Sequence, residues 1–232
     1  MHAVHDRLVG ALLRLRVRLV VLALRWRSRW HRAELVCEVD PDVRIGRRLR
    51  ISVQAGTRNV VRIEGRSRLW DDVRIELRGG SLLIGSGADI KTRCVLGVGG
   101  VLELQGANLL QHGCIIHCDE AVTVEHHAGL GEYTTVIDSS HVLGGPEGQW
   151  LHRIRTAPVV IGCNAWIGAK ATIARGVHVG EDAVVGANSL VVKDVPPGQL
   201  ASGVPAQVVR RRAADPDAPS PLGPPAVFAR PS

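Results

Sequence analysis

His141 is the residue of this sequence whose position most strongly indicates chemistry. It ends the motif Asp138-Ser-Ser-His141 and directly precedes residues 142–158, where the regular pattern of the surrounding chain is lost. Imidazole changes its charge near neutral pH, so a histidine beside such a loop can take a proton from a reacting group. The alternative is a structural histidine at a corner of the fold. A long loop that leaves a regular structure favours the functional interpretation.

A second group of side chains has the ligand types that metal ions use in proteins. Its members are His112, Cys114, His117, Cys118, His126 and His127. Cysteine and histidine at such spacings can bind zinc. Cys114, like Cys94, stands at the fifth place of a six-residue repeat, however, where we expect a small, buried and unreactive side chain. We therefore predict no metal and keep a metal site as a rival hypothesis.

The element that must position these groups is a six-residue repeat between Pro158 and Pro197. An aliphatic residue returns at every sixth place, at Ile161, Ile167, Ile173, Val179, Val185 and Val191. Glycine or alanine follows each of the first five. A period of six fits neither a helix nor a half-buried strand, but it fits a chain that turns a corner every six residues. We predict an all-β fold, a parallel β-helix that is a solenoid of hexapeptides.

A longer spacing indicates the length of each coil. The pattern aliphatic, any residue, aliphatic, then glycine or a polar residue begins at Val43, Val61, Leu82, Leu102, Val122, Val159 and Val177. Most of these intervals equal three hexapeptides or slightly more, and the interval from Val122 to Val159 is about twice as long. Because three hexapeptides make one triangular coil, we predict about seven coils over residues 37–195, stacked to roughly 34 Å. The long interval is one coil plus an inserted loop at residues 142–158.

The N-terminal segment, residues 1–36, is predicted to contain a basic amphipathic helix over residues 6–33. Arginines form one stripe, and aliphatic residues with two tryptophans cover the opposite side. The stripe contains Arg7, Arg14, Arg18, Arg25, Arg29 and Arg32, and the apolar side contains Leu8, Leu12, Leu15, Leu19, Val20, Leu24, Trp26 and Trp30. Such a helix suits the interface of an anionic membrane. The alternative is that its apolar face packs on the solenoid or on a partner subunit.

The charge and the cysteine count exclude several classes of protein. The formal net charge is +7, and residues 1–36 supply +6 of it, from eight Arg against Asp6 and Glu34. The body therefore lacks the basic face that nucleic-acid binding needs. Five cysteines form no even disulfide framework and no secretory signal is recognised, so we predict a cytoplasmic protein, with peripheral contact at the cytoplasmic face of the membrane. The longest uncharged run near the start, Leu19 to Leu24, is too short to span a bilayer.

The C-terminal part is predicted to be irregular. Residues 196–212 form a turn-rich cap after the last coil. Residues 213–232 are dominated by proline and alanine, which cannot build a packed core, so we expect a disordered tail.

These features together resemble the hexapeptide-repeat acyltransferases, in particular the maltose and galactoside O-acetyltransferases and relatives that acetylate sugars of surface polysaccharides. The resemblance covers about residues 80–212. The matching motifs are Asp138-Ser-Ser-His141, residues 158–169, 176–180, 185–189 and 193–197, and Gly203-Val-Pro-Ala206.

The resemblance implies a left-handed β-helix, a homotrimer, and acetyl-CoA bound as acyl donor in the groove between subunits. The hand rests on the resemblance alone, since the rule for parallel crossovers favours the right hand. His141 matches the general base of the family. Backbone amides near Ala169 and Ala187 would hold the pantetheine arm and the thioester carbonyl. Trp166 belongs to the same donor-binding group, and Lys193 and Arg210 would lie near the nucleotide end.

The acceptor side is less well determined by the resemblance. Gln111 stands where the sugar acetyltransferases carry an acceptor-binding Asn, so the acceptor of those enzymes cannot be transferred to this chain. Asp138 is a candidate for substrate binding as an orienting carboxylate, or else a turn residue. His152 lies on the inserted loop and is a candidate acceptor contact, or else a solvated loop residue.

We therefore predict an acetyl-CoA-dependent O-acetyltransferase that modifies a hydroxyl group of a sugar or glycan precursor. The basic helix suggests that this precursor is lipid-linked. Three alternatives stay open at this point. The first is a xenobiotic acetyltransferase that acts on an antibiotic, the second is a metalloenzyme similar to the γ-class carbonic anhydrases, and the third is a non-catalytic trimeric scaffold.

Overall fold

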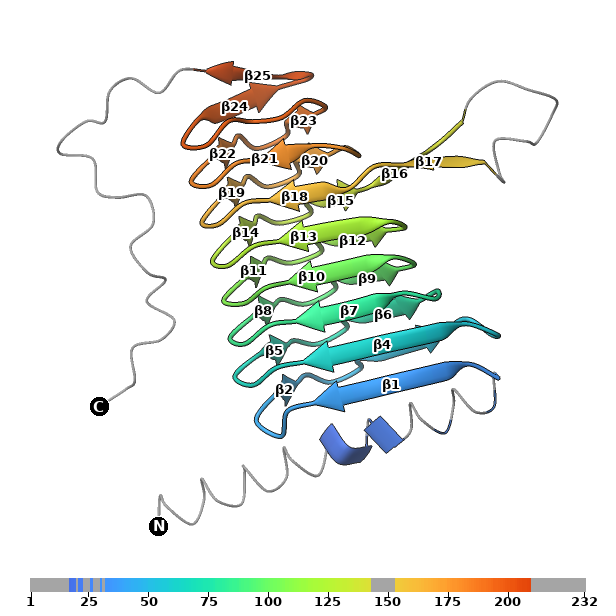
Figure 1. The fold of residues 1–232 in the computed structure, drawn as a ribbon. Helices are drawn as coiled ribbons and strands as arrows, with labels where there is room; N and C mark the ends of the chain where they lie inside the picture. The colour runs from blue at the N-terminus through green and yellow to red at the C-terminus, as the bar shows by residue number, and fades with distance from the viewer. Residues whose placement is uncertain are drawn as a thin grey trace, which may run out of the picture.

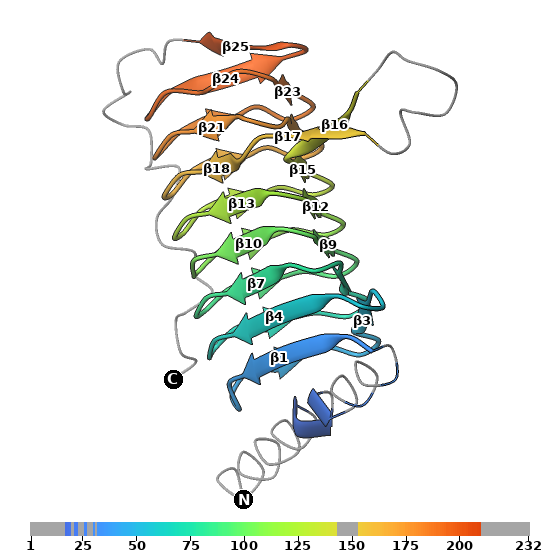
Figure 2. The same ribbon diagram turned by 45° about the vertical axis from the view of Figure 1, so that its right-hand side comes forward.

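The predicted solenoid is the architecture of the chain. The computed structural model describes residues 17–19, 21–22, 26, 30, 32–142 and 153–209. In this part of the chain, short strands stack in parallel into a β-solenoid of seven coils, with the N-terminal helical residues below the first coil (Figures 1 and 2). The all-β coil prediction is therefore confirmed, whereas the hand of the coil stays a prediction.

Each coil contributes one strand to each of three parallel sheets, which are the three faces of the solenoid. The first face contains β1 (Glu34–Val39), β4 (Arg58–Ile63), β7 (Ser81–Ile84), β10 (Val101–Leu104), β13 (Ala121–Val124), β18 (Val159–Ile161) and β21 (His178–Val179). The second face contains β2 (Arg44–Ile45), β5 (Arg68–Leu69), β8 (Asp89–Ile90), β11 (Leu109–Leu110), β14 (Gly129–Leu130), β19 (Trp166–Ile167) and β22 (Val184–Val185). The third face contains β3 (Arg50–Val53), β6 (Arg74–Leu77), β9 (Val95–Val98), β12 (Ile115–Cys118), β15 (Thr135–Ile137), β20 (Thr172–Ile173) and β23 (Leu190–Val191).

Three corners connect these faces. The first corner joins the first face to the second, and the second corner joins the second face to the third. The third corner carries the chain from the third face to the first face of the next coil. At the third corner after β15, the chain also forms an antiparallel pair, β16 (Ser139–His141) and β17 (Ile154–Thr156).

The core is the column of aliphatic residues that the six-residue repeat predicts. Ile161, Ile167, Ile173, Val179, Val185 and Val191 are all at most 1% exposed. The smaller residues four places later in the repeat, among them Ala165, Ala171 and Ala183, are also buried. One bulky column flanked by small residues thus fills the interior, as the sequence predicts.

Glycine at the corners is explained by the distance between coils. A Cβ atom on Gly162 would lie 2.7 Å from the backbone nitrogen of Glu181 in the next coil, and one on Gly168 would lie 2.5 Å from that of Ala187. Parallel strands stack about 4.8 Å apart, which leaves no room for a side chain there. These glycines therefore allow the coils to approach each other.

The coils become shorter along the stack. Hydrogen bonds between equivalent places in successive coils span 24 residues in the first coil and 21 residues in the second. They span 20 residues in the third and fourth coils. In the first coil above the inserted segment they span 18 residues, which is the length of three hexapeptides, and in the next they span 16. The register of the first face agrees with the intervals predicted from Val61 onward.

The first occurrence of the coil pattern, Val43 to Ile45, was wrongly predicted to lie on the same face as the later ones. Arg44–Ile45 is strand β2 of the second face, whereas the residue that pairs with Val61 on the first face is Cys37. Every face buries alternate aliphatic residues, so this short pattern does not identify one face.

The same register corrects the predicted start of the solenoid. Strand β1 begins at Glu34, inside the segment that we assigned to the N-terminal helix and before the predicted boundary at Cys37. At the other end, β24 (Leu200–Gly203) continues the second face and β25 (Ala206–Val209) turns back on it. The predicted cap thus contains an antiparallel hairpin. Its last residues and the predicted tail, 213–232, lie outside the described residues.

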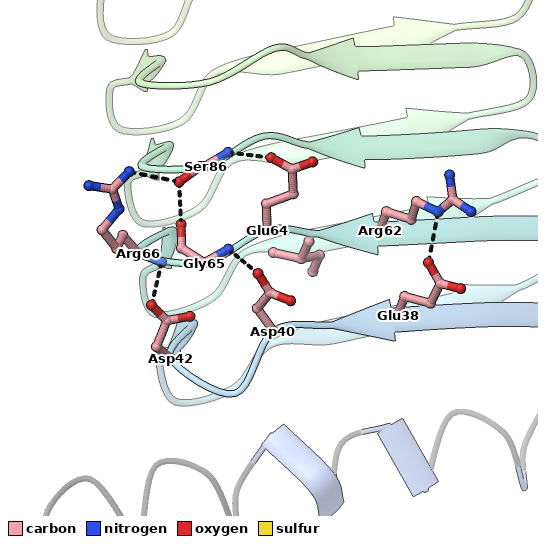
Figure 3. A pocket seen from close by; sticks show the side chains of 9 residues that line it. Glu38, Asp40, Asp42, Arg62, Glu64, Gly65, Arg66 and Ser86 are labelled. Atoms are coloured by element: carbon pink, nitrogen blue, oxygen red, sulfur yellow. Dashed lines mark hydrogen bonds and ion pairs between the residues drawn. The ribbon is translucent and has the colours of Figure 1, made fainter.

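Acidic side chains tie the coils together at the first corner. The carboxylates of Asp40, Glu64 and Glu125 accept hydrogen bonds of 2.7 to 3.0 Å from backbone amides of the next coil. Figure 3 shows two of these contacts around a hollow of about 460 Å³ in the first coils, where Arg62 also pairs with Glu38 at 2.8 Å. Because these charged groups are committed to contacts between coils, we assign this hollow a structural role.

The described N-terminal helical residues have two faces. Val17 is 4% exposed and belongs to the hydrophobic core, and Val21 packs against that core. Leu19, Trp26 and Trp30 are 57%, 67% and 76% exposed, and the two indole rings lie 5.9 Å apart. Most of the helix predicted over residues 6–33 lies outside the described residues. Within the described part of the chain, no helix is long and apolar enough to cross a membrane.

The cysteines are mainly core residues. Cys94 and Cys114 are fully buried, as predicted, and Cys118 is buried as well. Burial, assisted by the nearby Asp138 carboxylate, raises the pKa of Cys118 to about 12. Cys163 is half-buried, and its hydrogen bond with Glu125 raises its pKa.

The core column predicts how two residues of one strand differ in their contribution to stability. Leu104→Ala removes a fully buried side chain of β10 and should lower the free energy of unfolding by about 2–5 kcal/mol. Val101→Ala, in the same strand but at a position that is 46% exposed, should change it by less than about 0.5 kcal/mol. Urea denaturation followed by circular dichroism measures both. Equal losses would contradict the assignment of the inward face.

The cysteine environments predict an order of thiol modification. An aromatic disulfide reagent at pH 8 should modify Cys163 before the four buried cysteines, and slowly, because a raised pKa leaves little thiolate. The rate should increase with pH, and Glu125→Gln should increase it at pH 8 by lowering the pKa of Cys163. Mass spectrometry identifies the labelled residue. Cys163→Ser is the control, and earlier labelling of a buried cysteine in the native protein would contradict this order.

Candidate functional site

The inserted segment begins and ends as a two-stranded ribbon that leaves the third corner. His141 in β16 pairs with Ile154 in β17, and the amide of Val142 donates a hydrogen bond of 2.9 Å to the carbonyl of Arg153. Figures 1 and 2 both show the ribbon projecting away from the stack between β15 and β18. The predicted acceptor contact His152 lies outside the described residues.

Asp138 fixes the base of this ribbon. Its side chain is 0% exposed, and its carboxylate accepts hydrogen bonds of 2.8 to 3.0 Å from the amides of Asp119, Glu120 and Ala121. Its backbone carbonyl accepts a further bond from the amide of Ala157, where the ribbon returns. Because the carboxylate faces the backbone of the coil below, the geometry favours a turn residue over a residue that contacts an acceptor.

A hollow of about 330 Å³ lies beside His141. It is lined by Arg78, His117, Asp119, Ile137, Ser139, Ser140, His141 and Ile154. The His141 side chain is exposed at this hollow, and the apolar side chains of Ile137 and Ile154 form part of the wall. The hollow therefore combines a histidine with groups that can donate and accept hydrogen bonds.

The polar groups of the hollow are held by one another. Asp119 Oδ1 accepts a hydrogen bond of 3.0 Å from Arg78 Nη2, and Oδ2 accepts one of 2.6 Å from Ser139 Oγ. Above them, Arg175 Nε donates to Ser140 Oγ at 2.9 Å. Such contacts hold the groups around His141 in place.

Arg78, Asp119 and Ser139 were missed by the reasoning from sequence. They lie in three different coils, and each is separated from the next by one or two coil lengths: Arg78 and Asp119 by 41 residues and Asp119 and Ser139 by 20. The signal that could have found them is the coil register, since residues one coil apart at the same corner lie above one another. A search for polar residues at these intervals below Ser139, in the motif that ends at His141, would have identified Asp119 and Arg78.

The predicted donor-binding residues lie elsewhere on the chain. Trp166 is on the second face and covers Gly129, where a Cβ atom would come within 2.7 Å of the indole ring. Ala169 and Ala187 occupy equivalent places at the second corner, one coil apart. In the part of the chain that the structure describes, their amide nitrogens donate no hydrogen bond.

One chain does not bring all the predicted site residues together. His141 and Lys193 lie along the third corner, whereas Gln111, Ala169 and Ala187 lie along the second corner. The third face separates these two edges. Arg210 lies outside the described residues, and the roles of all these residues stay predictions.

The structure does not bring the six residues of the rival metal-site hypothesis together. Cys114 and Cys118 are buried, His117 faces the hollow, and His112 Nδ1 lies 2.7 Å from Thr92 Oγ1. Over residues 32–142 and 153–209, no three His, Cys, Asp or Glu side chains are placed to hold one ion.

Comparison with known proteins agrees with the repeat. Residues 158–193 match the family model described as bacterial transferase hexapeptide (six repeats). Galactoside O-acetyltransferase of Escherichia coli K12 is 49% identical over 53 residues, which cover 23% of this chain and 26% of that protein. The chain thus matches about a quarter of the length of this relative.

Solved structures show a more distant likeness over a longer part of the chain. A mutant of AntD, an N-acyltransferase from Bacillus cereus, in complex with a dTDP-amino sugar and coenzyme A, is 18% identical with a TM-score of 0.46 over 77% of this chain and 84% of that one. A hexapeptide-repeat acetyltransferase of Vibrio cholerae complexed with acetyl-CoA is 21% identical, with a TM-score of 0.44 over 87% and 84% of the two chains. The similarity at the level of a family model is thus to the hexapeptide repeat of bacterial transferases, over residues 158–193.

Proposed function

We propose that the protein is an acetyl-CoA-dependent O-acetyltransferase that modifies a hydroxyl group of a sugar or glycan precursor. The observation that carries this proposal is the position of His141. It lies exposed at a hollow that contains polar groups, on the ribbon that precedes the hexapeptide repeat shared with acetyltransferases. A hollow lined by Asp119, Ser139 and Arg78 suits an acceptor rich in hydroxyl groups, because it offers both donors and acceptors of hydrogen bonds.

His141 acts as the general base in this proposal. A hydroxyl group is a weak nucleophile at neutral pH, and a neutral imidazole within hydrogen-bonding distance takes its proton as the oxygen attacks the thioester carbonyl. The C–S bond then breaks, the acetyl group stays on the acceptor oxygen, and the thiolate of coenzyme A leaves. The proton on the imidazole neutralises the leaving sulfur, so no covalent enzyme intermediate is required.

The second corner supplies the proposed site for the acyl donor. The amides of Ala169 and Ala187 have no partner among the described residues and can donate to the pantetheine arm and to the oxygen that becomes negative during attack. Small residues along this corner let a thin ligand approach the backbone. Trp166 and the cations Lys193 and Arg210 complete the proposed donor site.

We propose a homotrimer, which is supported by the separation of these two groups. His141 lies along the third corner and the donor amides along the second, so a single chain cannot hold both substrates at one point. If neighbouring copies pack edge to edge around a threefold axis, the third corner of one copy faces the second corner of the next. We propose that each active site forms at such a boundary.

The N-terminal helix is proposed to hold the enzyme at an anionic membrane, on its cytoplasmic face. Among the described helical residues, Val17 and Val21 contact the hydrophobic core of the solenoid. Leu19, Leu22, Trp26 and Trp30 remain exposed, and the segment carries a net charge of +6. Tryptophan at headgroup depth beside arginine suits an anionic lipid surface, and lipid-linked glycans are then accessible acceptors.

The role of His141 can be tested by replacing it with a residue that keeps a polar group but cannot take the proton. His141→Gln should lower kcat by about 100- to 10,000-fold, measured as release of free thiol from acetyl-CoA with a panel of sugar acceptors. His178→Gln, at an exposed histidine of β21, should leave the rate unchanged. Gel filtration with light scattering checks that both variants keep the same oligomeric state. Normal activity of His141→Gln would exclude the proposed base, and an inactive wild-type protein that forms trimers would favour a scaffold.

The membrane contact can be tested with vesicles. The full chain should sediment with vesicles of phosphatidylglycerol and phosphatidylcholine, and less with phosphatidylcholine alone, and binding should weaken as salt is added. The double variant Trp26→Ser, Trp30→Ser should lose most of this binding. The double variant Val208→Ser, Val209→Ser, which changes two exposed apolar residues at the opposite end of the solenoid, should bind like the wild type. Equal binding by all three proteins would refute the contact.

A further inference from the structure

A column of four residues runs up the third corner to the ribbon that carries His141. Leu77 pairs with Val98 and Val98 with Cys118, so the residues that follow them, Arg78, Gly99 and Asp119, lie above one another in successive coils. Ser139 follows one coil later at the same spacing. We call Arg78, Gly99, Asp119 and Ser139 the third-corner column.

Arg78 reaches across two coils within this column. Its Nη2 atom donates to Asp119 Oδ1 at 3.0 Å, although the two residues are separated by the coil that contains Gly97 and Gly99. A Cβ atom on Gly97 would lie 3.3 Å from Arg78 Nη2, and one on Gly99 would lie 3.3 Å from Asp119 Oδ1. Larger side chains at these two glycines would therefore crowd the path of the guanidinium group.

The position of Arg78 is fixed by its partner. Asp119 accepts from Arg78 with one oxygen and from Ser139 Oγ with the other, and its own amide donates to the buried Asp138. Arginine held by a carboxylate in this way presents its remaining N–H groups in a defined direction. The side chain of Arg78 is 38% exposed, so those groups are accessible from the hollow.

The side chains of Arg78 and Asp119 offer a ligand in the hollow more hydrogen-bond donors than free hydrogen-bond acceptors. A guanidinium has five N–H donors, and the hydrogen bonds of the described structure use one of them at Arg78. Both oxygens of Asp119, the carboxylate that lines the hollow, are already engaged. Two further cations neighbour Ser140 of the lining: Arg175 donates a hydrogen bond to it, and Arg155 lies opposite it in the ribbon. This balance suits a ligand with negatively charged oxygens.

The register also limits where the charge of such a ligand lies. The guanidinium of Arg78 lies beside Asp119, and the third corner of the coil above Asp119 carries the ribbon with His141. Adjacent coils are about 4.8 Å apart. An acceptor whose hydroxyl group lies at His141 therefore reaches Arg78 with a group on the same sugar or on the sugar directly linked to it.

We propose that Arg78 is a specificity-determining residue that selects acceptors with an anionic group, a carboxylate or a phosphate, close to the acetylated hydroxyl. The proposal rests on the proposed function and adds the charge of its substrate. It differs from a purely structural role for Arg78, in which the guanidinium does no more than hold Asp119 in place. The two roles predict different dependence on the charge of the acceptor.

The test compares three disaccharides that differ in charge: maltose, maltose 1-phosphate and maltobionate. With the wild-type protein, at least one anionic form should have a KM about 10- to 100-fold lower than maltose, and the two forms distinguish phosphate from carboxylate. Arg78→Gln should raise KM for the preferred anion by a similar factor and raise KM for maltose by a much smaller factor. Arg78→Lys keeps the charge and should recover part of the preference.

Arg74→Gln is the matched control, because it removes a cation from β6, the strand that directly precedes Arg78, at a position outside the hollow of His141. It should leave the preference unchanged. Calorimetric titration of the three sugars without acetyl-CoA compares their dissociation constants independently of activity. If the protein binds the anionic sugars more tightly but does not acetylate them, the proposed reaction has failed and the proposed role of Arg78 has not. Acetylation of maltose and its anionic forms with equal KM, no binding of any of them, or an equal loss for all three in Arg78→Gln would each overturn the proposal.

Discussion

The spacing between coils is the constraint on which the rest of this structure depends. Parallel strands that share hydrogen bonds must lie about 4.8 Å apart, and this distance applies along three faces and three corners at once. Gly162 and Gly168 meet it at the corners by having no side chain, and the aliphatic column from Ile161 to Val191 meets it inside by repeating one size of residue. A residue that breaks this spacing must point outward or leave the stack.

The candidate site is a consequence of this constraint. The extra residues of the inserted segment cannot be accommodated within a coil, so they leave at a corner as the ribbon of β16 and β17. Asp138 compensates for the interruption by binding three amides of the coil below, which keeps His141 in a fixed relation to the stack. The ribbon of β16 and β17, which departs from the repeat, is therefore joined to the repeat by hydrogen bonds at its base.

The sequence was a good guide wherever a feature repeats and a poor guide where it depends on several coils. The hexads, the coil lengths from Val61 onward and the burial of Cys94 and Cys114 could be predicted, because each follows from one residue type at one interval. The first coil was wrongly predicted, because it is longer than the interval from Val43 to Val61. In addition, the residues from Val43 to Ile45, which lead into β2 of the second face, have the same pattern as strands of the first face. Arg78 and Asp119 could not be paired from sequence, because their contact crosses 41 residues and depends on glycines in the coil between them.

The decrease in coil length has a consequence for how such a protein can change. The perimeter falls from 24 residues at the base to 18 residues above the ribbon, so the solenoid tapers and its two ends are not interchangeable. Below the ribbon, the third and fourth turns both contain 20 residues, so duplication of one of them would insert a unit that fits. A duplicated first or second turn, of 24 or 21 residues, would meet a neighbour of different circumference. Above the ribbon, the turn of 18 residues is followed by one of 16. Gene rearrangement could thus lengthen the middle of the solenoid in whole turns, while its two ends could change only by substitution.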